Sequence, residues 1–417
     1  MKYPRIAALA LLPTFAAAQG PEVPPGPPGP TQKSLQEIWD RIGVLQSQSD
    51  VLQTQNNLLQ SQNTALQSKL DGVARQNQMI LYTAGIINWQ VTTVDDSGAA
   101  GLNGTLEMDP QGRPAIAYLD NIAGPWLKLA RYDGTTWQVS TVGASGTNAT
   151  FISLAFGADG HPAIAYHDSS SGHLKFARFN GTIWVTSTVD STGLTGRYCS
   201  LAFRPDGDPA ISYYDQTNGN LEYARYNGFL WLRTTVDSGG DVGRHTSLAF
   251  GPDNQPAISY YDTTNENLKY ASFDGTSWTS SAVDSGGNVG EYTSLAFGPD
   301  EQPSIAYSDA TNSALKIARL DGIAWVVSTI DEQGFVGSFA SLAFGPDGQP
   351  AISYLDDNND NLKFAHYNGS KWTISFADSA GEVGSFSSLA FGPDGHPVIS
   401  YYDIGKGHLK VAVSVAP

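Results

Sequence analysis

The chain has 417 residues and a formal net charge of −17, from 40 acidic and 23 basic side chains. Such an acidic surface repels nucleic acid and anionic membranes, so we expect neither as a partner. A single cysteine, Cys199, excludes an internal disulfide.

Residues 1–18 have the pattern of a secretory signal peptide. Lys2 and Arg5 precede an apolar stretch at residues 6–16, and three alanines that end at Ala18 provide a cleavage site. The apolar stretch is too short to span a bilayer, and no later stretch is long and apolar enough. We therefore expect a secreted, extracellular or surface-displayed protein, with an uncleaved anchor as the alternative. Residues 19–32 are rich in Pro and Gly and predict a stiff, collagen-like spacer.

Residues 33–82 carry a heptad pattern that indicates a coiled coil. Apolar residues recur every seven positions without an intervening proline, and Asn occupies several positions of the second seam. A single helix cannot bury so narrow a stripe, so we predict a parallel bundle with other copies of this chain. The pattern leaves dimer and trimer open, and one helix folded back on the rest of the chain is the alternative. The first seam consists of Ile38, Leu45, Leu52, Leu59, Leu66, Val73 and Ile80.

The remaining residues, 86–417, repeat a unit of 47 residues. Each copy has four short runs of β-branched and aromatic residues, separated by Gly, Pro, Asn and Asp. Four strands in a repeat near 45 residues are typical of a β-propeller blade. Seven prolines and seven tryptophans mark the copies: Pro114, Pro162, Pro209, Pro256, Pro303, Pro350 and Pro397, with Trp89, Trp137, Trp184, Trp231, Trp278, Trp325 and Trp372.

The first and last copies are incomplete in complementary ways. The last copy stops after its third run, near Val413, and an extra tryptophan run at residues 89–94 precedes the first copy. If these two runs pair, seven blades are complete and no edge strand is free. We therefore predict a mainly β fold: a seven-bladed β-propeller whose N-terminal strand closes the last blade, preceded by a long α-helical coiled coil. An open solenoid is the alternative.

Acidic residues recur where strands end, on one face of the predicted propeller. One set ends the second run of every blade, and a second set ends the tryptophan runs, except that Gly143 replaces the acid in one copy. With nearby Tyr and Asn, these acids predict shallow sites for sugar hydroxyls or Ca²⁺. The alternative is that each Asp only closes its loop through backbone N–H groups. Trp126, which has no equivalent in other copies, is the best candidate for an exposed aromatic contact, with a hydrophobic cover as the alternative. The candidate binding residues are Asp120, Asp168, Asp215, Asp262, Asp309, Asp356, Asp403 and Trp126.

No catalytic motif is recognisable. The seven histidines show no zinc-ligand spacing, and the chain has neither a Gly-x-Ser-x-Gly elbow nor a phosphate loop. Catalysis requires a unique arrangement of groups, whereas these blades hardly differ. We therefore expect no enzymatic activity and no cofactor other than Ca²⁺. Cys199 stands where other copies have Thr or Ala, which predicts a small buried residue.

The run Ser-Leu-Ala-Phe-Gly-Pro-Asp-Gly-Gln-Pro-Ala-Ile-Ser-Tyr, at residues 341–354, resembles a repeat of exported bacterial propeller proteins. The resemblance covers Trp89 to Val413, and the architecture is similar to that of seven-bladed bacterial lectins, which bind sugars at or between blades. It implies an oligomeric adhesin or lectin-like protein whose head recognises a surface glycan or a protein, with avidity from oligomerisation. A secreted hydrolase or lyase with a site at the channel mouth, or a structural matrix component, are the alternatives. The sialidase Asp-box does not match, because Asp274 and Gly275 are adjacent.

Overall fold

The computed structural model describes residues 35–84, 87–122, 124–143 and 147–415. The expected signal peptide and spacer lie outside these residues. Contacts divide the chain into two units, residues 1–69 and 70–417, which are described separately.

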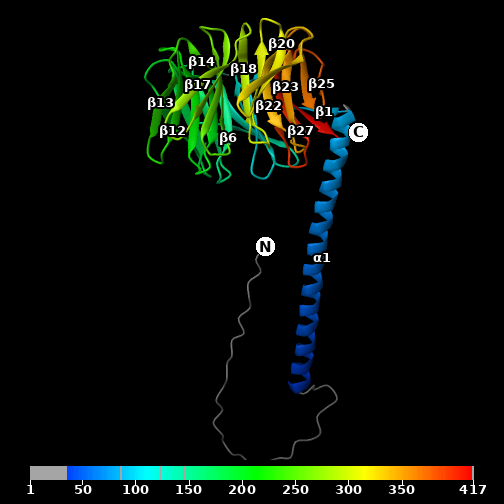
Figure 1. Ribbon diagram of the computed structural model, residues 1–417. Coiled ribbons are helices and arrows are strands. Elements are labelled where there is room, and N and C mark those ends of the chain that lie inside the picture. The colour runs from blue at the N-terminus through cyan, green and yellow to red at the C-terminus, as the bar shows by residue number, and fades with distance from the viewer. Residues whose placement is uncertain (1–34, 85–86, 123, 144–146, 416–417) are drawn as a thin grey trace, which may run out of the picture. The chain divides into compact units, whose positions relative to one another are not determined.

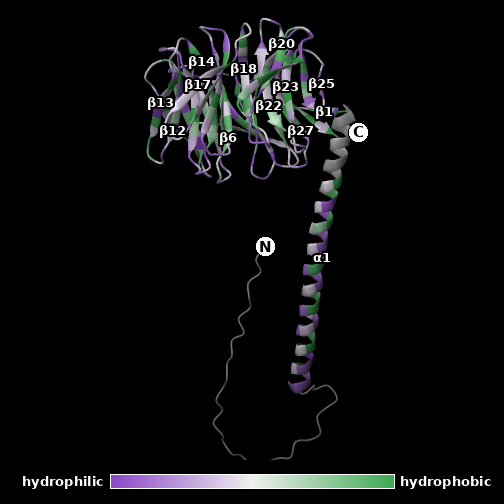
Figure 2. Cartoon of the chain, in the orientation of Figure 1, coloured by the Kyte–Doolittle hydropathy of each residue, from purple (hydrophilic) through white to green (hydrophobic). Residues whose placement is uncertain are grey.

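One long helix, α1 (Leu35–Ala84), covers the predicted heptad region. Gln, Leu, Ser and Asn dominate its sequence, and no proline interrupts it. The described seam side chains are exposed, as Leu52 at 64% and Leu66 at 63% illustrate, and Figure 2 shows apolar and polar positions alternating along the helix. The helix is confirmed, whereas its pairing with other copies stays a prediction. In the described residues, α1 is not apolar enough to cross a membrane.

The described strands form seven antiparallel sheets of four strands each, which confirms the seven-bladed propeller (Figure 1). We number the sheets as blades 1–7. Blade 1 contains β2 (Ala100–Met108), β3 (Pro114–Asp120), β4 (Trp126–Tyr132) and β5 (Trp137–Thr141). Blade 2 contains β6 (Ala149–Phe156), β7 (Pro162–Asp168), β8 (His173–Phe179) and β9 (Trp184–Asp190). Blade 3 contains β10 (Thr195–Phe203), β11 (Pro209–Asp215), β12 (Asn220–Tyr226) and β13 (Trp231–Asp237).

The remaining blades repeat this order. Blade 4 contains β14 (Val242–Phe250), β15 (Pro256–Asp262), β16 (Asn267–Phe273) and β17 (Trp278–Asp284). Blade 5 contains β18 (Val289–Phe297), β19 (Pro303–Asp309), β20 (Ala314–Asp321) and β21 (Ala324–Asp331). Blade 6 contains β22 (Val336–Phe344), β23 (Pro350–Asp356), β24 (Asn361–Tyr367) and β25 (Trp372–Asp378). Blade 7 contains β26 (Val383–Phe391), β27 (Pro397–Asp403), β28 (His408–Val415) and β1 (Asn88–Asp95).

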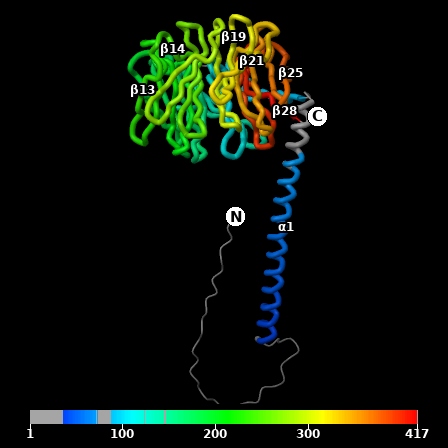
Figure 3. Tube along the Cα trace, viewed as in Figure 1, coloured from blue at the N-terminus to red at the C-terminus, as the bar shows by residue number. Residues whose placement is uncertain are grey.

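The ring closes through β1, as the incomplete end copies predicted. β1 runs antiparallel to β28 and places Trp89 opposite Ser414. Figure 3 traces successive blades around the ring, from the green blade with β13 to the orange blade with β25. Since the last sheet is completed by the first strand, no open solenoid edge remains in the described propeller.

The core lies between neighbouring blades. The second strands are buried along almost their whole length, and β11 and β15 are buried at every position. Ile258 and Tyr260 of blade 4, for example, pack in one cluster with Leu221 and Tyr223 of blade 3. Both faces of each sheet are therefore covered, which explains why the second strands are apolar without alternation. First strands of neighbouring blades contact one another around the channel, and the fourth strands lie on the outside.

Candidate functional site

Most of the predicted acidic residues form a buried cluster that joins neighbouring blades. In blade 5, the hydroxyl of Tyr307 donates to Asp284 Oδ2 of blade 4 at 2.7 Å. Lys316 Nζ lies 3.3 Å from Asp284 and 2.7 Å from Asp309. We call this arrangement the blade latch: a second-strand Tyr, a third-strand Lys, the Asp that ends the second strand, and the Asp that ends the outer strand of the preceding blade.

The latch recurs in five of the seven blades. In every case the tyrosine donates to the preceding blade's acid, and the lysine lies within 4.0 Å of both carboxylates. The members are Tyr118, Asp95, Lys128 and Asp120; Tyr260, Asp237, Lys269 and Asp262; Tyr307, Asp284, Lys316 and Asp309; Tyr354, Asp331, Lys363 and Asp356; and Tyr401, Asp378, Lys410 and Asp403.

The candidate acids that end the second strands are mostly buried members of the blade latches. Six of the seven second-strand acids are buried, and Asp309 has no exposed surface; Asp168 alone is half-buried. Their other oxygen accepts backbone N–H groups of the following loop, as Asp309 does from Asn312 at 2.9 Å. These hydrogen bonds close the loop after each second strand. In the complete latches the same aspartate also forms an ion pair with the lysine of the third strand. Among the described residues, no three His, Cys, Asp or Glu side chains are arranged to hold a metal ion.

The charges of the latch stabilise one another. Burial by itself raises the pKa of Asp284, but hydrogen bonds from Tyr307 and from the Gly286 N–H, with the charge of Lys316, outweigh it and hold the pKa below its ordinary value. Burial tends to lower the pKa of Lys316, yet its two carboxylates raise it above the ordinary value. The ion pair therefore stays charged at neutral pH, and it contributes to blade packing as long as every member is present.

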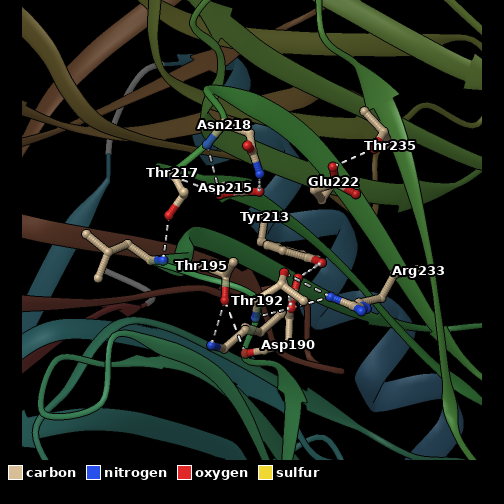
Figure 4. Close-up of polar contacts among 12 residues, drawn as sticks. Asp190, Thr192, Thr195, Tyr213, Asp215, Thr217, Asn218, Glu222, Arg233 and Thr235 are labelled. Carbon is tan, nitrogen blue, oxygen red and sulfur yellow. Dashed lines mark hydrogen bonds and ion pairs between the residues drawn. The ribbon is translucent and has the colours of Figure 1, made fainter.

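Blade 3 departs from this pattern, as Figure 4 shows. Glu222 stands where the lysine should be, and Arg233 of the outer strand supplies the cation to Asp190. Tyr213 still donates to Asp190 at 2.7 Å, and Glu222 accepts a 2.6 Å hydrogen bond from Thr235. Burial and the nearby charges of Asp215 and Asp190 raise the pKa of Glu222. The exchange moves a positive charge from the third strand to the outside of the blade.

Arg233 faces a groove of about 920 Å³ between the outer strands of blades 2 and 3. Trp231 and Asp190 lie beside it, and Arg178 of blade 2 also lines the groove, paired with Asp159 at 2.9 Å. Phe229, in the hairpin between β12 and β13, is 90% exposed at the rim. The volume is within the range of pockets that hold small ligands. Aromatic, guanidinium and carboxylate groups together provide stacking surface and directional hydrogen bonds.

A second groove, of about 790 Å³, lies between blades 7 and 1. Arg113 and Trp137 line it, but Arg113 is bound to Asp109 by two hydrogen bonds, at 2.9 and 2.7 Å. The position of Arg233 is occupied by Val91 in blade 7 and by Val139 in blade 1. The groove between blades 2 and 3 therefore combines more exposed aromatic surface with an arginine unique to its position.

The central channel contains a ring of side chains that sequence reasoning missed. One residue per inner strand has a left-handed backbone, at a bulge of the strand, and their side chains line a cavity of about 240 Å³. Neighbouring aromatic side chains are in contact, as Tyr292 and Phe339 are, with ring centroids 4.8 Å apart. Burial lowers the pKa of His245 to about 3. The recurrence of aromatic residues at this repeat position was the available signal. The ring consists of Asn103, Phe151, Tyr198, His245, Tyr292, Phe339 and Phe386.

Glu107 is a second residue that the sequence analysis did not single out. It lies at an inner-strand position where each of the other six blades has alanine. Its side chain reaches solvent, but the surrounding protein raises its pKa to about 7. The equivalents in blades 2–7 are Ala155, Ala202, Ala249, Ala296, Ala343 and Ala390.

The remaining sequence candidates are Trp126, the repeated tryptophans and Cys199, and a contact role for Trp126 stays a prediction. Trp126 is half-buried at the start of β4, outside both outer grooves. The repeated tryptophans are half-buried, and four of them pack on an aromatic residue of the preceding blade, as Trp278 does on Tyr223 with centroids 5.2 Å apart. Cys199 is buried, and its thiol donates to the carbonyl oxygen of Phe151. Burial raises the pKa of this thiol, so it is the small buried residue that was predicted.

Comparison with known proteins identifies the fold only. No protein-family model matches the chain, and no curated protein matches it. Among solved structures, a PL25 polysaccharide lyase described as an ulvan lyase has a TM-score of 0.55 at 13% identity, covering 78% of this chain and 98% of that one. YCF48 bound to D1 peptide has a TM-score of 0.53 at 13% identity and covers 79% and 95%. A protein of unknown function from Dyadobacter fermentans has a TM-score of 0.52 at 13% identity and covers 79% and 98%. The SapL1 lectin in complex with alpha methyl fucoside is less similar, with a TM-score of 0.47 at 14% identity and coverage of 68% and 97%.

Proposed function

We propose that this protein is a glycan-binding protein and that the groove between blades 2 and 3 holds the sugar. One observation carries the proposal. At this groove alone, Arg233 departs from the repeat to put a guanidinium beside Asp190, next to exposed aromatic and apolar side chains of the β12–β13 hairpin. Sugars present apolar C–H faces and in-plane hydroxyls, which suit aromatic platforms and paired charged groups.

The exposed hairpin supports this assignment. Phe229 and Leu230 stand where the equivalent hairpins of blades 1 and 4 have Thr and Ser. Phe229 is 90% exposed and lines the groove between blades 2 and 3, whereas Ile323, 99% exposed in the equivalent hairpin of blade 5, lines neither outer groove. The position of Phe229 at the groove, and not its exposure, therefore supports ligand contact. The formal net charge of −17 argues against nucleic acid as the partner.

We further propose that the chain is exported and acts as an oligomer through α1. The exposed seam, with Leu52, Leu59 and Leu66 uncovered on the described helix, supports a coiled coil with other copies. Several heads on one bundle would raise the effective affinity of a weak sugar site.

The decisive experiment is a glycan array on the full chain and on one double variant. Glu222→Lys with Arg233→Ser restores the residue types of the other blades, so the latch should close and the fold should persist. We expect this variant to keep its thermal stability and lose glycan binding. Retained binding, or no binding by the parent protein to any glycan, would refute the proposal.

A matched pair of hairpin variants locates the site. Phe229→Ser should weaken binding by up to about tenfold, because an aromatic contact is worth about 0.5–1.5 kcal/mol and about 1.4 kcal/mol corresponds to a tenfold change in affinity. Ile323→Ser changes the equivalent residue of blade 5, which is 99% exposed, and should leave binding unchanged. Equal effects of the two substitutions would place the site elsewhere.

A second candidate is a hydrolase or lyase with its site in the channel, and Glu107 is the observation that favours it. This carboxyl occurs in one blade only, on an inner strand, so it supplies the kind of unique acidic group that catalysis on a repeated fold requires. Incubation with neutral and acidic polysaccharides, with detection of new reducing ends and of unsaturated uronate by ultraviolet absorbance, tests it. Activity that disappears in Glu107→Gln would support an enzyme; no activity on any substrate would remove this candidate.

A further inference from the structure

Blade 2 has a latch that lacks one of its two carboxylates. The preceding outer strand, β5, ends at Thr141, whereas the other outer strands continue to the latch aspartate. Gly143 stands at the aspartate's repeat position with a φ of 74°, a left-handed backbone that the aspartates do not have. One extra residue in this copy, which makes its step 48 instead of 47, accompanies the change.

The other members of this latch are present, but among the described residues neither the tyrosine nor the lysine is hydrogen-bonded to a carboxylate. Tyr166 stands where the latch tyrosines stand, and the described residues give its hydroxyl no hydrogen bond. Lys175 Nζ donates to Thr188 Oγ1 at 2.7 Å and has no carboxylate within 4.0 Å among the described residues. Asp168 instead accepts from the Ser170 N–H and the Ser171 hydroxyl. We call this place the open latch.

A cavity of about 260 Å³ occupies the open latch. Tyr166, Lys175 and Asp168 line it together with hydroxyl-bearing residues of β9 and the adjoining loops. The volume exceeds what one carboxylate needs, and the hydroxyl-rich wall suits a polar ligand. The hydroxyl-bearing lining residues are Thr147, Ser170, Thr186, Ser187 and Thr188.

The complete latches show what the open latch is built to hold. Tyrosine-to-carboxylate distances are 2.5 Å at Asp95, 2.6 Å at Asp237 and 2.8 Å at Asp331. In each complete latch one lysine is shared by two carboxylates, so Asp168 alone does not fill the open latch. An entering carboxylate would restore the same two-to-one arrangement. Charge-assisted hydrogen bonds of this kind are stronger than neutral ones, so a carboxylate is a better partner for Lys175 than the Thr188 hydroxyl, and it would also give the Tyr166 hydroxyl an acceptor.

We propose that the open latch binds the carboxylate of an acidic sugar, such as a uronic acid residue, in place of the missing aspartate. The assignment to a sugar rests on the proposed glycan-binding function, while the carboxylate follows from the latch itself. Ser187 and Thr188 line both the open latch and the groove between blades 2 and 3, so the two cavities adjoin along β9. A glycan with an acidic residue can therefore engage this region through both features.

The test is an NMR titration of the full chain with D-glucuronate, D-glucose and acetate. We expect glucuronate to bind more tightly than either, and Lys175→Met to weaken it about tenfold or more, with a smaller loss in Tyr166→Phe. Equal binding of glucuronate by parent and Lys175→Met would overturn the proposal. Glucuronate bound no better than acetate would overturn the assignment to a sugar.

Two matched controls come from blade 5. Lys316→Met and Tyr307→Phe make the same changes in a complete latch, so they should lower the melting temperature and leave glucuronate binding unchanged. Lys175→Met should hardly change the melting temperature, because Lys175 has no carboxylate partner to lose. If Lys175→Met destabilises the fold as much as Lys316→Met, the latch is already satisfied and the proposal fails.

The two proposals fail separately. If Lys175→Met abolishes glucuronate binding but the array shows no glycan, the carboxylate site stands and the groove function falls. If glycans on the array depend on Arg233 but acidic and neutral glycans bind alike, the groove function stands and the open latch is refuted.

Discussion

The backbone N–H of Leu106 in blade 1 donates a 3.0 Å hydrogen bond to Ser388 Oγ in blade 7, across 282 residues of sequence. The same bond joins Leu248 to Ser200 and Leu295 to Ser247 at 3.0 Å, each across 48 residues. The contact that closes the ring is thus the same contact that joins internal neighbours. Ring closure therefore needs no special residues, only β1 to complete the seventh sheet.

Removal of β1 should open the ring. A head that begins at residue 97 lacks the strand paired with β28 and the contact of Trp89 with Phe364, whose centroids lie 5.2 Å apart. We expect a large loss of thermal stability and aggregation through the exposed strand edge. Thermal unfolding and size-exclusion chromatography, against a head that begins at residue 87, measure it. Equal melting temperatures would contradict the role of β1.

The latches should make the propeller sensitive to acid. The pKa of Asp284 is lower in the folded protein than its ordinary value of 3.8. This contribution to stability is fully present above about pH 4 and is lost as the pH falls through the folded pKa. Tyr307→Phe removes one hydrogen bond to this carboxylate, so it should cost about 1–3 kcal/mol at pH 7 and less in acid. Urea unfolding at pH 7 and pH 3 measures the difference, and a cost that does not depend on pH would contradict this account.

Glu222 should have the opposite pH dependence. Burial raises its pKa above the ordinary value of 4.5, so folding is favoured while the carboxyl is protonated. Stability from this group is greatest below the ordinary pKa and declines as the pH rises through the folded pKa. Glu222→Gln should therefore raise the melting temperature at pH 7 and have little effect at pH 4. A lower melting temperature at pH 7 would mean that the Glu222 charge is stabilising.

At the left-handed positions of the channel ring, a Gly substitution should be less destabilising than an Ala substitution. Tyr292 has a φ of 53°, a conformation that costs a residue with a Cβ about 1–2 kcal/mol and costs Gly almost nothing. Tyr292→Gly and Tyr292→Ala lose the same ring contacts with His245 and Phe339. We expect the Gly variant to be the more stable of the two by about 1 kcal/mol in urea unfolding. An Ala variant that is equally or more stable would show that this backbone is not strained.

The seam of α1 should direct self-association. We expect residues 19–417 to form a dimer or trimer and residues 87–417 to be monomeric, with multi-angle light scattering as the measurement. Leu52→Glu together with Leu59→Glu puts two charges into the seam and should dissociate the bundle without affecting the head. A monomeric parent protein would exclude the coiled coil.

The sequence alone determined the architecture, because architecture depends on periodicity. The 47-residue period, the four runs per copy and the displaced tryptophan run predicted the seven blades and the closure at Trp89. The heptads predicted α1. These patterns are local, so they are visible without coordinates.

Only the tertiary structure decided what the repeated acids do. Asp284 and Asp309 lie 25 positions apart and belong to different blades, and only the packed propeller brings both to Lys316. The sequence showed that Gly143 replaces an aspartate, but not that this leaves Tyr166 and Lys175 without their carboxylate. A buried aspartate requires a cationic partner, and the loss of one aspartate leaves a cavity. Neither result can be read from the sequence, because the side chains involved come from neighbouring blades and meet only in the packed propeller.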